Sequence, residues 1–247
     1  MRARQLELVG THEVMGHGGR RKGAGRKPGP GRRRHEHKVR PFHDRRLPVH
    51  VTLRVTGEVG RLRRRSAYQA VRWAMIKTVG RANFRIVHLS IQGNHIHLLC
   101  EADDRIALAN GVRGFCVSAA RRLNAAISKE RGEQRRGRVF TDRYHATTIT
   151  HPRQARNALA YVLNNWRKHR DDRGAMRTAQ VDPYSTAVWF PAWAERDGVP
   201  FVWPKGYEPL PCRAPTTWLL KEGWKRGRAV VSVREVPGGF EEMLARA

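Results

Sequence analysis

The sequence predicts an α+β domain of the ferredoxin-like type, in which an antiparallel sheet is built in the order βαββαβ. Short stretches that alternate between apolar and polar residues are typical of half-buried strands. Longer stretches between them carry apolar residues every three to four positions, which is typical of amphipathic helices. A Gly93-Asn94 pair between two of the strand-like stretches predicts a hairpin.

The predicted elements occupy the middle of the chain. In order they are a strand over 49–55, a helix over 66–79 that Ser66 caps and Gly80 ends, strands over 84–91 and 95–101, a helix over 106–129, a strand over 145–150 and a helix over 152–169. We expect the third strand to lie inside the sheet and the helices to pack on one face. Ile96 and Leu98 then face the helix layer.

The third strand contains the stretch Gly93-Asn94-His95-Ile96-His97-Leu98-Leu99. Because successive side chains of a strand alternate faces, His95 and His97 share one face, about 7 Å apart. A histidine pair that leaves coordination positions open suits a catalytic first-row metal ion, zinc included. The alternative is two hydrogen-bonded histidines on a half-exposed strand.

The last predicted helix carries a tyrosine away from its apolar stripe. Six residues spaced for one buried face form the stripe: Ala155, Ala158, Leu159, Val162, Leu163 and Trp166. At about 100° per residue, Tyr161 and Asn165 lie together on a flank of that stripe. We expect the Tyr161 hydroxyl to meet a ligand there, on a polar flank with Gln154, Asn157 and Lys168; the alternative is an ordinary boundary tyrosine.

These features together resemble the single-tyrosine HUH transposases, and within them the REP-associated tyrosine transposases. The matching residues are Asn94 to Leu99, the segment Gly137 to His145 before a strand, and Tyr161 with Asn165. The resemblance spans about residues 48–170. In this sequence Gln92-Gly93 replaces the usual Met-Pro, and Trp166 replaces a proline, which leaves Asn164 and Asn165 both open as the functional asparagine.

The resemblance implies a ferredoxin-like HUH fold and DNA strand cleavage through a 5′-phosphotyrosine. Tyr161 would be the nucleophile, and His95, His97 and Asn165 would hold Mg²⁺ or Mn²⁺. The implied substrate is single-stranded or hairpin DNA at palindromic repeats, beside a short single-stranded guide. Whether Tyr161 acts in its own site or in that of a partner, and whether the protein is a monomer or a homodimer, stay open.

Other readings of the histidine pair fit less well. A histidine-triad hydrolase needs a third histidine where Leu99 stands, and a zinc deaminase needs HxE with PCxxC, which is absent. The main alternative is a nucleic-acid-binding module on the same fold without catalysis. The joint presence of His95, His97, Tyr161 and Asn165 argues against it.

The charge of the chain independently predicts a polyanionic partner. With 49 Lys and Arg against 21 Asp and Glu, the net charge is +28 and the isoelectric point near 11.5. Nucleic acid is the expected partner, because no apolar run approaches the ~18 residues of a membrane span and no basic amphipathic helix is evident. The first 20 residues lack the apolar region typical of a signal peptide, and the three scattered cysteines favour a reducing compartment. We therefore expect a cytoplasmic, nucleoid-associated bacterial protein with no membrane contact.

Three regions are predicted. Residues 1–47 form a basic arm rich in Gly, Pro and Arg, which is too poor in apolar residues to fold. We expect Arg26 and Lys27 to bind DNA, within a polycationic arm or, alternatively, as an AT-hook-like core that reads the minor groove. Residues 48–170 form the catalytic domain, where the expected contacts to the DNA backbone, alternatively a solvated charged face, are Arg121, Arg122, Arg135, Arg136 and Arg138.

Residues 171–247 form an irregular extension that holds five of the seven tryptophans, at 189, 193, 203, 218 and 224. One helix is predicted near Thr217 to Arg226. Tryptophans can stack on unpaired bases, but they more commonly pack an irregular segment onto a domain. We expect the extension to wrap on the catalytic domain.

Overall fold

The computed structural model describes residues 43–141, 143–172, 181–195, 205–226 and 230–238. Arg26, Lys27 and most of the predicted arm lie outside these ranges. The strands are β1 (Val49–Arg54), β2 (Phe84–Ile91), β3 (His95–Ala102) and β4 (His145–Thr148). The α-helices are α1 (Arg65–Val79), α2 (Arg105–Arg131), α3 (Pro152–Lys168) and α4 (Trp218–Lys221), and the 3₁₀ turns are η1 (Gly57–Val59), η3 (Ala187–Trp189) and η4 (Gly223–Arg226).

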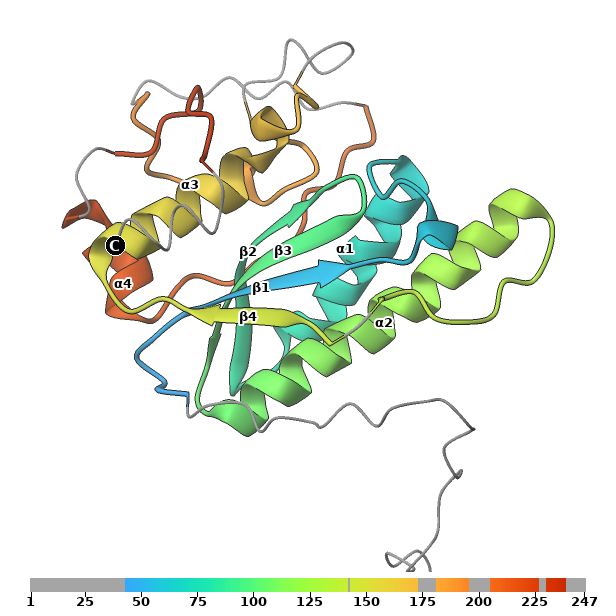
Figure 1. Cartoon of the computed structure of the whole chain (residues 1–247), viewed down its shortest axis with the longest axis horizontal. Coiled ribbons are helices and arrows are strands. Elements are labelled where there is room, and N and C mark those ends of the chain that lie inside the picture. Colours follow the sequence, from blue (N-terminus) through green and yellow to red (C-terminus); the bar gives the residue numbers. More distant parts are fainter. Residues whose placement is uncertain (1–42, 142, 173–180, 196–204, 227–229, 239–247) are drawn as a thin grey trace, which may run out of the picture. The chain divides into compact units, whose positions relative to one another are not determined.

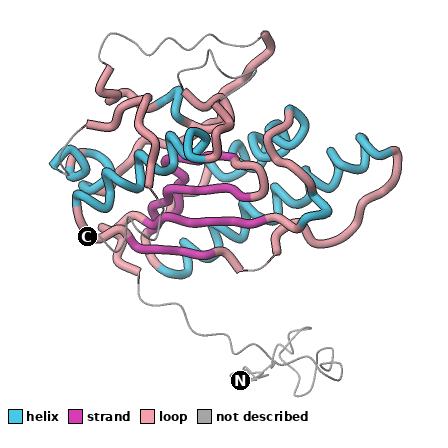
Figure 2. The backbone as a smooth tube through the Cα atoms, turned by 45° about the horizontal axis from the view of Figure 1, so that its top comes forward, coloured by secondary structure: helices cyan, strands magenta, loops and turns pink. Residues whose placement is uncertain are grey.

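The four strands lie side by side in one sheet (Figure 2). Their order is β2-β3-β1-β4, and every neighbouring pair is antiparallel. This confirms the predicted ferredoxin-like α+β fold, with β3 inside the sheet. In the register of β1 and β3, Thr52 is paired with His97 and Arg54 with His95. Residues that are paired directly share a face, so the two histidines lie beside Thr52 and Arg54.

Helices cover both faces of the sheet (Figure 1). The helices α1 and α2 pack on one face, where Ile96, Leu98 and Cys100 join their core as expected. Gly111 of α2 allows close packing, because a Cβ there would lie 2.1 Å from the Phe84 ring. On the other face α3 packs against β2 and β3. The expectation that the helices pack on one face of the sheet therefore holds for α1 and α2 but not for α3.

Of the element ends that differ from the prediction, two do so because side chains find other partners. Ser66 does not cap α1, whose N-cap is Arg64; the Ser66 hydroxyl donates instead to Glu130 of α2. The strand β4 ends at Thr148 rather than at 150, because the Thr150 amide donates to Oε1 of Gln154 at the start of α3. The hairpin at Gly93-Asn94 is present, with the Gln92 amide donating to the His95 carbonyl at 2.8 Å.

The C-terminal extension packs on α3 and along the edge of β2. Trp193 and Trp224 are buried in the core on that side, which fits a packing role. Trp189 and Trp218 are half exposed, and Trp203 lies outside the described residues. The extension also hydrogen-bonds to β2, with the Thr186 amide donating to the Leu89 carbonyl at 2.9 Å.

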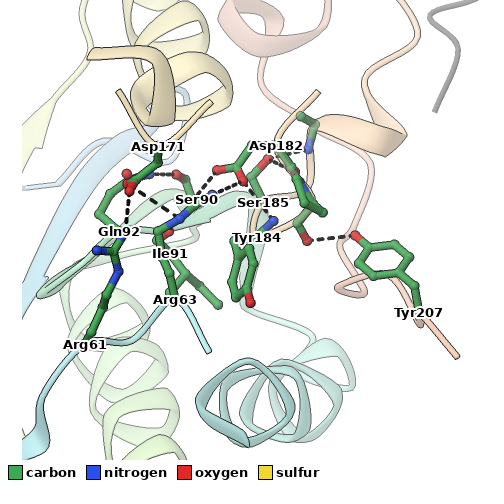
Figure 3. Close-up of polar contacts among 12 residues, drawn as sticks. Arg61, Arg63, Ser90, Ile91, Gln92, Asp171, Asp182, Tyr184, Ser185 and Tyr207 are labelled. Atoms are coloured by element: carbon green, nitrogen blue, oxygen red, sulfur yellow. Dashed lines mark hydrogen bonds and ion pairs between the residues drawn. The ribbon is translucent and has the colours of Figure 1, made fainter. Parts of the chain in front are cut away.

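A buried ion-pair network joins the extension to the segment before α1 (Figure 3). Arg63 donates to both carboxylate oxygens of Asp182, at 2.9 and 2.8 Å, and to the carbonyl of Ile91 at 2.9 Å. Its Nε lies 3.5 Å from Asp171, which follows α3. The side chains of Arg63 and Asp182 are 4% and 0% exposed. The network therefore fixes the turn before His95 and the end of α3 to the same arginine.

Within the described ranges, no helix is long and apolar enough to cross a bilayer. Cys100, Cys116 and Cys212 are free thiols.

Candidate active site

The histidine pair lies where β3 begins, on the face of the sheet that α3 covers. The ring centroids of His95 and His97 are 4.6 Å apart with their planes at 84°. This confirms the predicted shared face. Nδ1 of His95 lies 2.7 Å from Oδ1 of Asn94, an acceptor, so His95 donates through Nδ1 and keeps the lone pair of Nε2.

His97 is buried and contacts two side chains of β1. Its Nδ1 lies 3.2 Å from Nε2 of His50 and 3.3 Å from Oγ1 of Thr52. Its Nε2 is buried and has no hydrogen-bond partner among the described residues. An unpartnered buried nitrogen is costly unless a ligand completes it.

Tyr161 of α3 approaches the same histidines edge-on. Its ring centroid lies 5.0 Å from that of His97 and 5.8 Å from that of His50, with interplanar angles of 83° and 85°. Nζ of Lys168 lies 5.6 Å from the Tyr161 ring centroid. Tyr161 is only 7% exposed, because its ring packs against His50 and His97 of the sheet. The tyrosine thus faces the histidines, with Lys168 of the predicted polar flank beside its ring, and a contact of its hydroxyl with a ligand stays a prediction.

The structure separates the roles of the two asparagines. Nδ2 of Asn164 donates to the carbonyl of Ser232 at 2.8 Å, so Asn164 anchors the extension. Asn165 is fully buried beside Tyr161, and the one polar contact of its amide among the described residues is with the Tyr161 hydroxyl. Asn165 is thus the asparagine that lies at the site.

Burial keeps the site imidazoles neutral at physiological pH. It lowers the pKa of His95 to about 4, with nearby His169, Arg54 and Lys168 acting in the same direction. Burial also lowers the pKa of His97 well below its usual value, and that of His50 to about 3. Neutral imidazoles can offer a nitrogen lone pair to a metal ion. Burial raises the pKa of Tyr161, while its polar contact with Asn165 opposes this to a smaller extent.

The residues present fit a small divalent ion. Among the described residues no group of three or more His, Cys, Asp or Glu side chains forms a metal site. The donors at hand are instead two imidazoles and an amide oxygen: His95 and His97 through Nε2, and Asn165 through Oδ1. Nε2 of His97 is buried without a partner among the described residues, and the buried Asn165 amide contacts only the Tyr161 hydroxyl, so both residues can take a cation as a further partner.

The arginines of residues 48–170 that were predicted to contact DNA differ in exposure and in location. Arg121, Arg122, Arg136 and Arg138 are exposed. Arg122 lies over the Trp73 ring of α1, in the helix layer on the opposite face of the sheet from Tyr161. Arg135 is 6% exposed and donates to Asn124, to Glu58 and to the Arg138 carbonyl. The predicted phosphate contact by Arg135 does not fit this arrangement, because its guanidinium holds the loop together.

The segment that follows Arg138 lies at the histidine end of the sheet. The Thr56 amide donates to the carbonyl of Val139 at 2.8 Å, and Val55 pairs with Phe140. Since Arg54 is paired with His95, the segment after Arg138 runs along the end of β1 nearest the site.

Four residues near the site were missed by the sequence reasoning: His50, Thr52, Arg54 and His169. Alternation in β1 could have found the first three, because it places them on the face opposite Val51 and Leu53. The ring of His169 lies 5.5 Å from that of His95. His169 comes one helical turn after Asn165, which is the signal that could have indicated it.

A protein family and several solved structures match this chain. The family model for IS200-like transposases matches residues 45–165. A solved structure of a REP-associated tyrosine transposase bound to a REP hairpin is 18% identical, covers 61% of this chain and 81% of that chain, and has a TM-score of 0.42. A search of curated proteins gives no match. The family match runs from just before β1 through both histidines to Asn165, and over these residues the chain belongs to the IS200-like transposases.

Proposed function

We propose that this transposase cleaves and rejoins single-stranded DNA through a covalent link between Tyr161 and a 5′-phosphate. The observation that carries the proposal is the meeting of Tyr161 with Asn165 and with His97, whose unpartnered Nε2 suits a cation. Family membership supports DNA cleavage and transfer as the general activity. The expected assembly is a monomer or a homodimer, acting where bacterial DNA lies, in the cytoplasm.

In the proposed step, Oη of Tyr161 attacks phosphorus and the bond from phosphorus to O3′ breaks. Tyr161 gives up its proton, O3′ gains one, and the products are a 5′-phosphotyrosine and a 3′-hydroxyl. Because the new phosphodiester keeps the energy of the old one, the reverse attack by a 3′-hydroxyl rejoins DNA without a nucleotide cofactor. Cleavage and strand transfer are then the same reaction in two directions.

His95, His97 and Asn165 would hold Mg²⁺ or Mn²⁺. When bound, the ion supplies Lewis-acid polarisation of the scissile phosphate and neutralises developing charge. The chain contributes the orientation of Tyr161 and the nearby cationic charge of Lys168, which favours the phenolate. This help is needed because burial raises the Tyr161 pKa above its ordinary value.

The proposed substrate is DNA that forms hairpins at palindromic repeats. The solved relative bound to a REP hairpin motivates this choice, together with the net charge of +28. The half of the site face formed by β1 and β4 offers an approach, since Arg54 and His145 are exposed there. Cationic and hydrogen-bonding side chains at this edge suit a phosphate backbone.

The test is to incubate the protein with hairpin oligonucleotides and Mg²⁺ or Mn²⁺, and to look for an adduct that survives denaturation. Each oligonucleotide is labelled at either its 5′ or its 3′ end. The 3′ label should stay with the protein and the 5′ label should leave on a fragment with a 3′-hydroxyl. A 5′ label on the protein would mean that the tyrosine is linked to a 3′-phosphate, which would contradict the proposal. Tight binding without any adduct would favour the non-catalytic module.

A further inference from the structure

We infer that His50 is a positioning residue of the proposed metal site. Its Nε2 accepts the Nδ1 proton of His97 and thereby leaves the lone pair of His97 Nε2 for the ion. The inference rests on the proposed function, because it assigns His50 a role toward the metal that His97 would hold.

The two rings are nearly parallel and are joined by a hydrogen bond between their nitrogens. Nε2 of His50 lies 3.2 Å from Nδ1 of His97, the planes differ by 18°, and the centroids are 5.1 Å apart. Tyr161 stands nearly perpendicular to both rings, so it does not interrupt their contact.

The single proton of a neutral His97 determines which ring donates in the hydrogen bond between His50 and His97 when a metal ion is bound. A neutral imidazole has one N–H and one lone pair. Since Nδ1 of His97 faces His50 and Thr52, only Nε2 is left for a ligand. A metal-binding Nε2 needs its lone pair, so the proton must sit on Nδ1 and requires an acceptor.

His50 is better placed to accept this proton than Thr52. His50 is fully buried in β1, which is paired on one side with β3 and on the other with β4, so the ring has little freedom. The Thr52 contact is slightly longer, at 3.3 Å, and is partly exposed. The other proposed histidine ligand follows the same scheme, because Oδ1 of Asn94 accepts from Nδ1 of His95 at 2.7 Å. Each imidazole would thus have its own orienting partner.

The test measures the affinity of the full chain for Mn²⁺ without DNA. The electron paramagnetic resonance signal of the free ion reports how much Mn²⁺ is unbound. His50→Phe keeps a ring but removes the acceptor, and it should weaken Mn²⁺ binding about 10- to 100-fold. His50→Gln, which offers an amide oxygen at similar reach, should recover part of the affinity. Thr52→Val should change it less than about threefold.

His88→Phe is the matched control, because His88 is also a buried histidine but lies on β2 and bonds to Thr186. It should leave Mn²⁺ affinity unchanged, and thermal unfolding checks that each variant folds. Wild-type affinity in a folded His50→Phe chain overturns the inference, as does a loss in Thr52→Val equal to that in His50→Phe. If His50→Phe does not fold, wild-type affinity in His50→Ala overturns it equally. Absence of Mn²⁺ binding by the wild type would instead remove the proposed metal site itself.

Discussion

The rings of Tyr161 and His97 meet at 83°, with centroids 5.0 Å apart. One comes from α3 and the other from the inner strand β3, so this contact joins two layers of the fold. It brings the proposed nucleophile to a proposed metal ligand although 64 residues separate them in sequence. The buried ion pair between Arg63 and Asp182 and the neutral buried histidines also lead to testable predictions.

Replacing Tyr161 by Phe should abolish the covalent adduct and leave DNA binding within severalfold. The reason is that only the hydroxyl is lost, while the ring that packs against His50 and His97 remains. The measurement is adduct formation on denaturing gels beside a binding titration. Tyr144→Phe is the control, because Tyr144 packs with the core on the other face of the sheet. If the Tyr161 variant still forms the adduct and the Tyr144 variant does not, Tyr144 would be the nucleophile.

Alanine at His95 or at His97 should lower metal-dependent cleavage at least about a hundredfold, because Lewis-acid stabilisation is worth several kcal/mol. Cleavage is measured with and without added Mn²⁺, and folding is checked by circular dichroism. His88→Gln should retain cleavage, since His88 bonds to Thr186 away from the pair. Full cleavage without metal in either alanine variant would refute the metal site.

Stability should fall as the pH is lowered below 6.5. Burial lowers the pKa of His88 to about 4 and that of His50 to about 3, whereas in the unfolded chain both titrate near 6.5. Between these values the unfolded state binds more protons, so stability is full above pH 6.5 and decreases toward pH 4. Each of these two histidines should cost roughly 1 kcal/mol at pH 5.5.

Urea unfolding at pH 7.5 and at pH 5.5 measures this loss. His88→Gln should reduce the dependence of stability on pH by the contribution of one histidine, because glutamine does not titrate. A stability that stays constant over this interval would show that the buried histidines take up protons as readily as in the unfolded chain.

Removing one partner of the ion pair between Arg63 and Asp182 should destabilise the fold by about 3 kcal/mol or more. The remaining charge would stay buried without compensation, since the two side chains are 4% and 0% exposed. Asp182→Asn and Arg63→Ala are compared with Lys225→Ala, whose partner Glu222 is exposed. The free energy of unfolding is the measurement, and a change below that of the surface control would contradict the structural role of the network.

Deleting residues 1–46 should weaken DNA binding at low salt and flatten its salt dependence. Each phosphate neutralised on duplex DNA contributes about 0.9 to the slope of log K against log salt, and about 0.7 on single strands. Binding titrations at several salt concentrations measure the slope. Cleavage at saturating DNA should persist, because the proposed site lies within residues 50–169.

AT-rich and GC-rich duplexes serve as the comparison for this deletion. Equal losses of affinity indicate a polycationic arm, whereas a selective loss for AT-rich DNA would favour a minor-groove contact by Arg26 and Lys27. An unchanged salt slope would contradict both.

Short-range patterns were enough to predict the sheet and the shared face of the histidines. Strand alternation placed His95 and His97 together and Ile96 opposite them, because a period of two follows from the geometry of an extended chain. Helical spacing likewise placed Tyr161 and Asn165 on one flank. The ferredoxin-like order followed from these elements and the Gly93-Asn94 turn, since all of this information is contained in neighbouring residues.

The environment of those side chains was decided by tertiary structure alone. His50 meets His97 only through the register of β1 against β3, and Asn164 donates to the carbonyl of Ser232, which is far along the chain. Tyr161 is buried because α3 packs on the sheet, where the tyrosine ring meets His50 and His97. Burial, hydrogen-bond partners and pKa depend on contacts between residues far apart in sequence. A periodicity within one element cannot encode such contacts, and so the sequence predicted where the functional groups lie on each element but not which groups surround them.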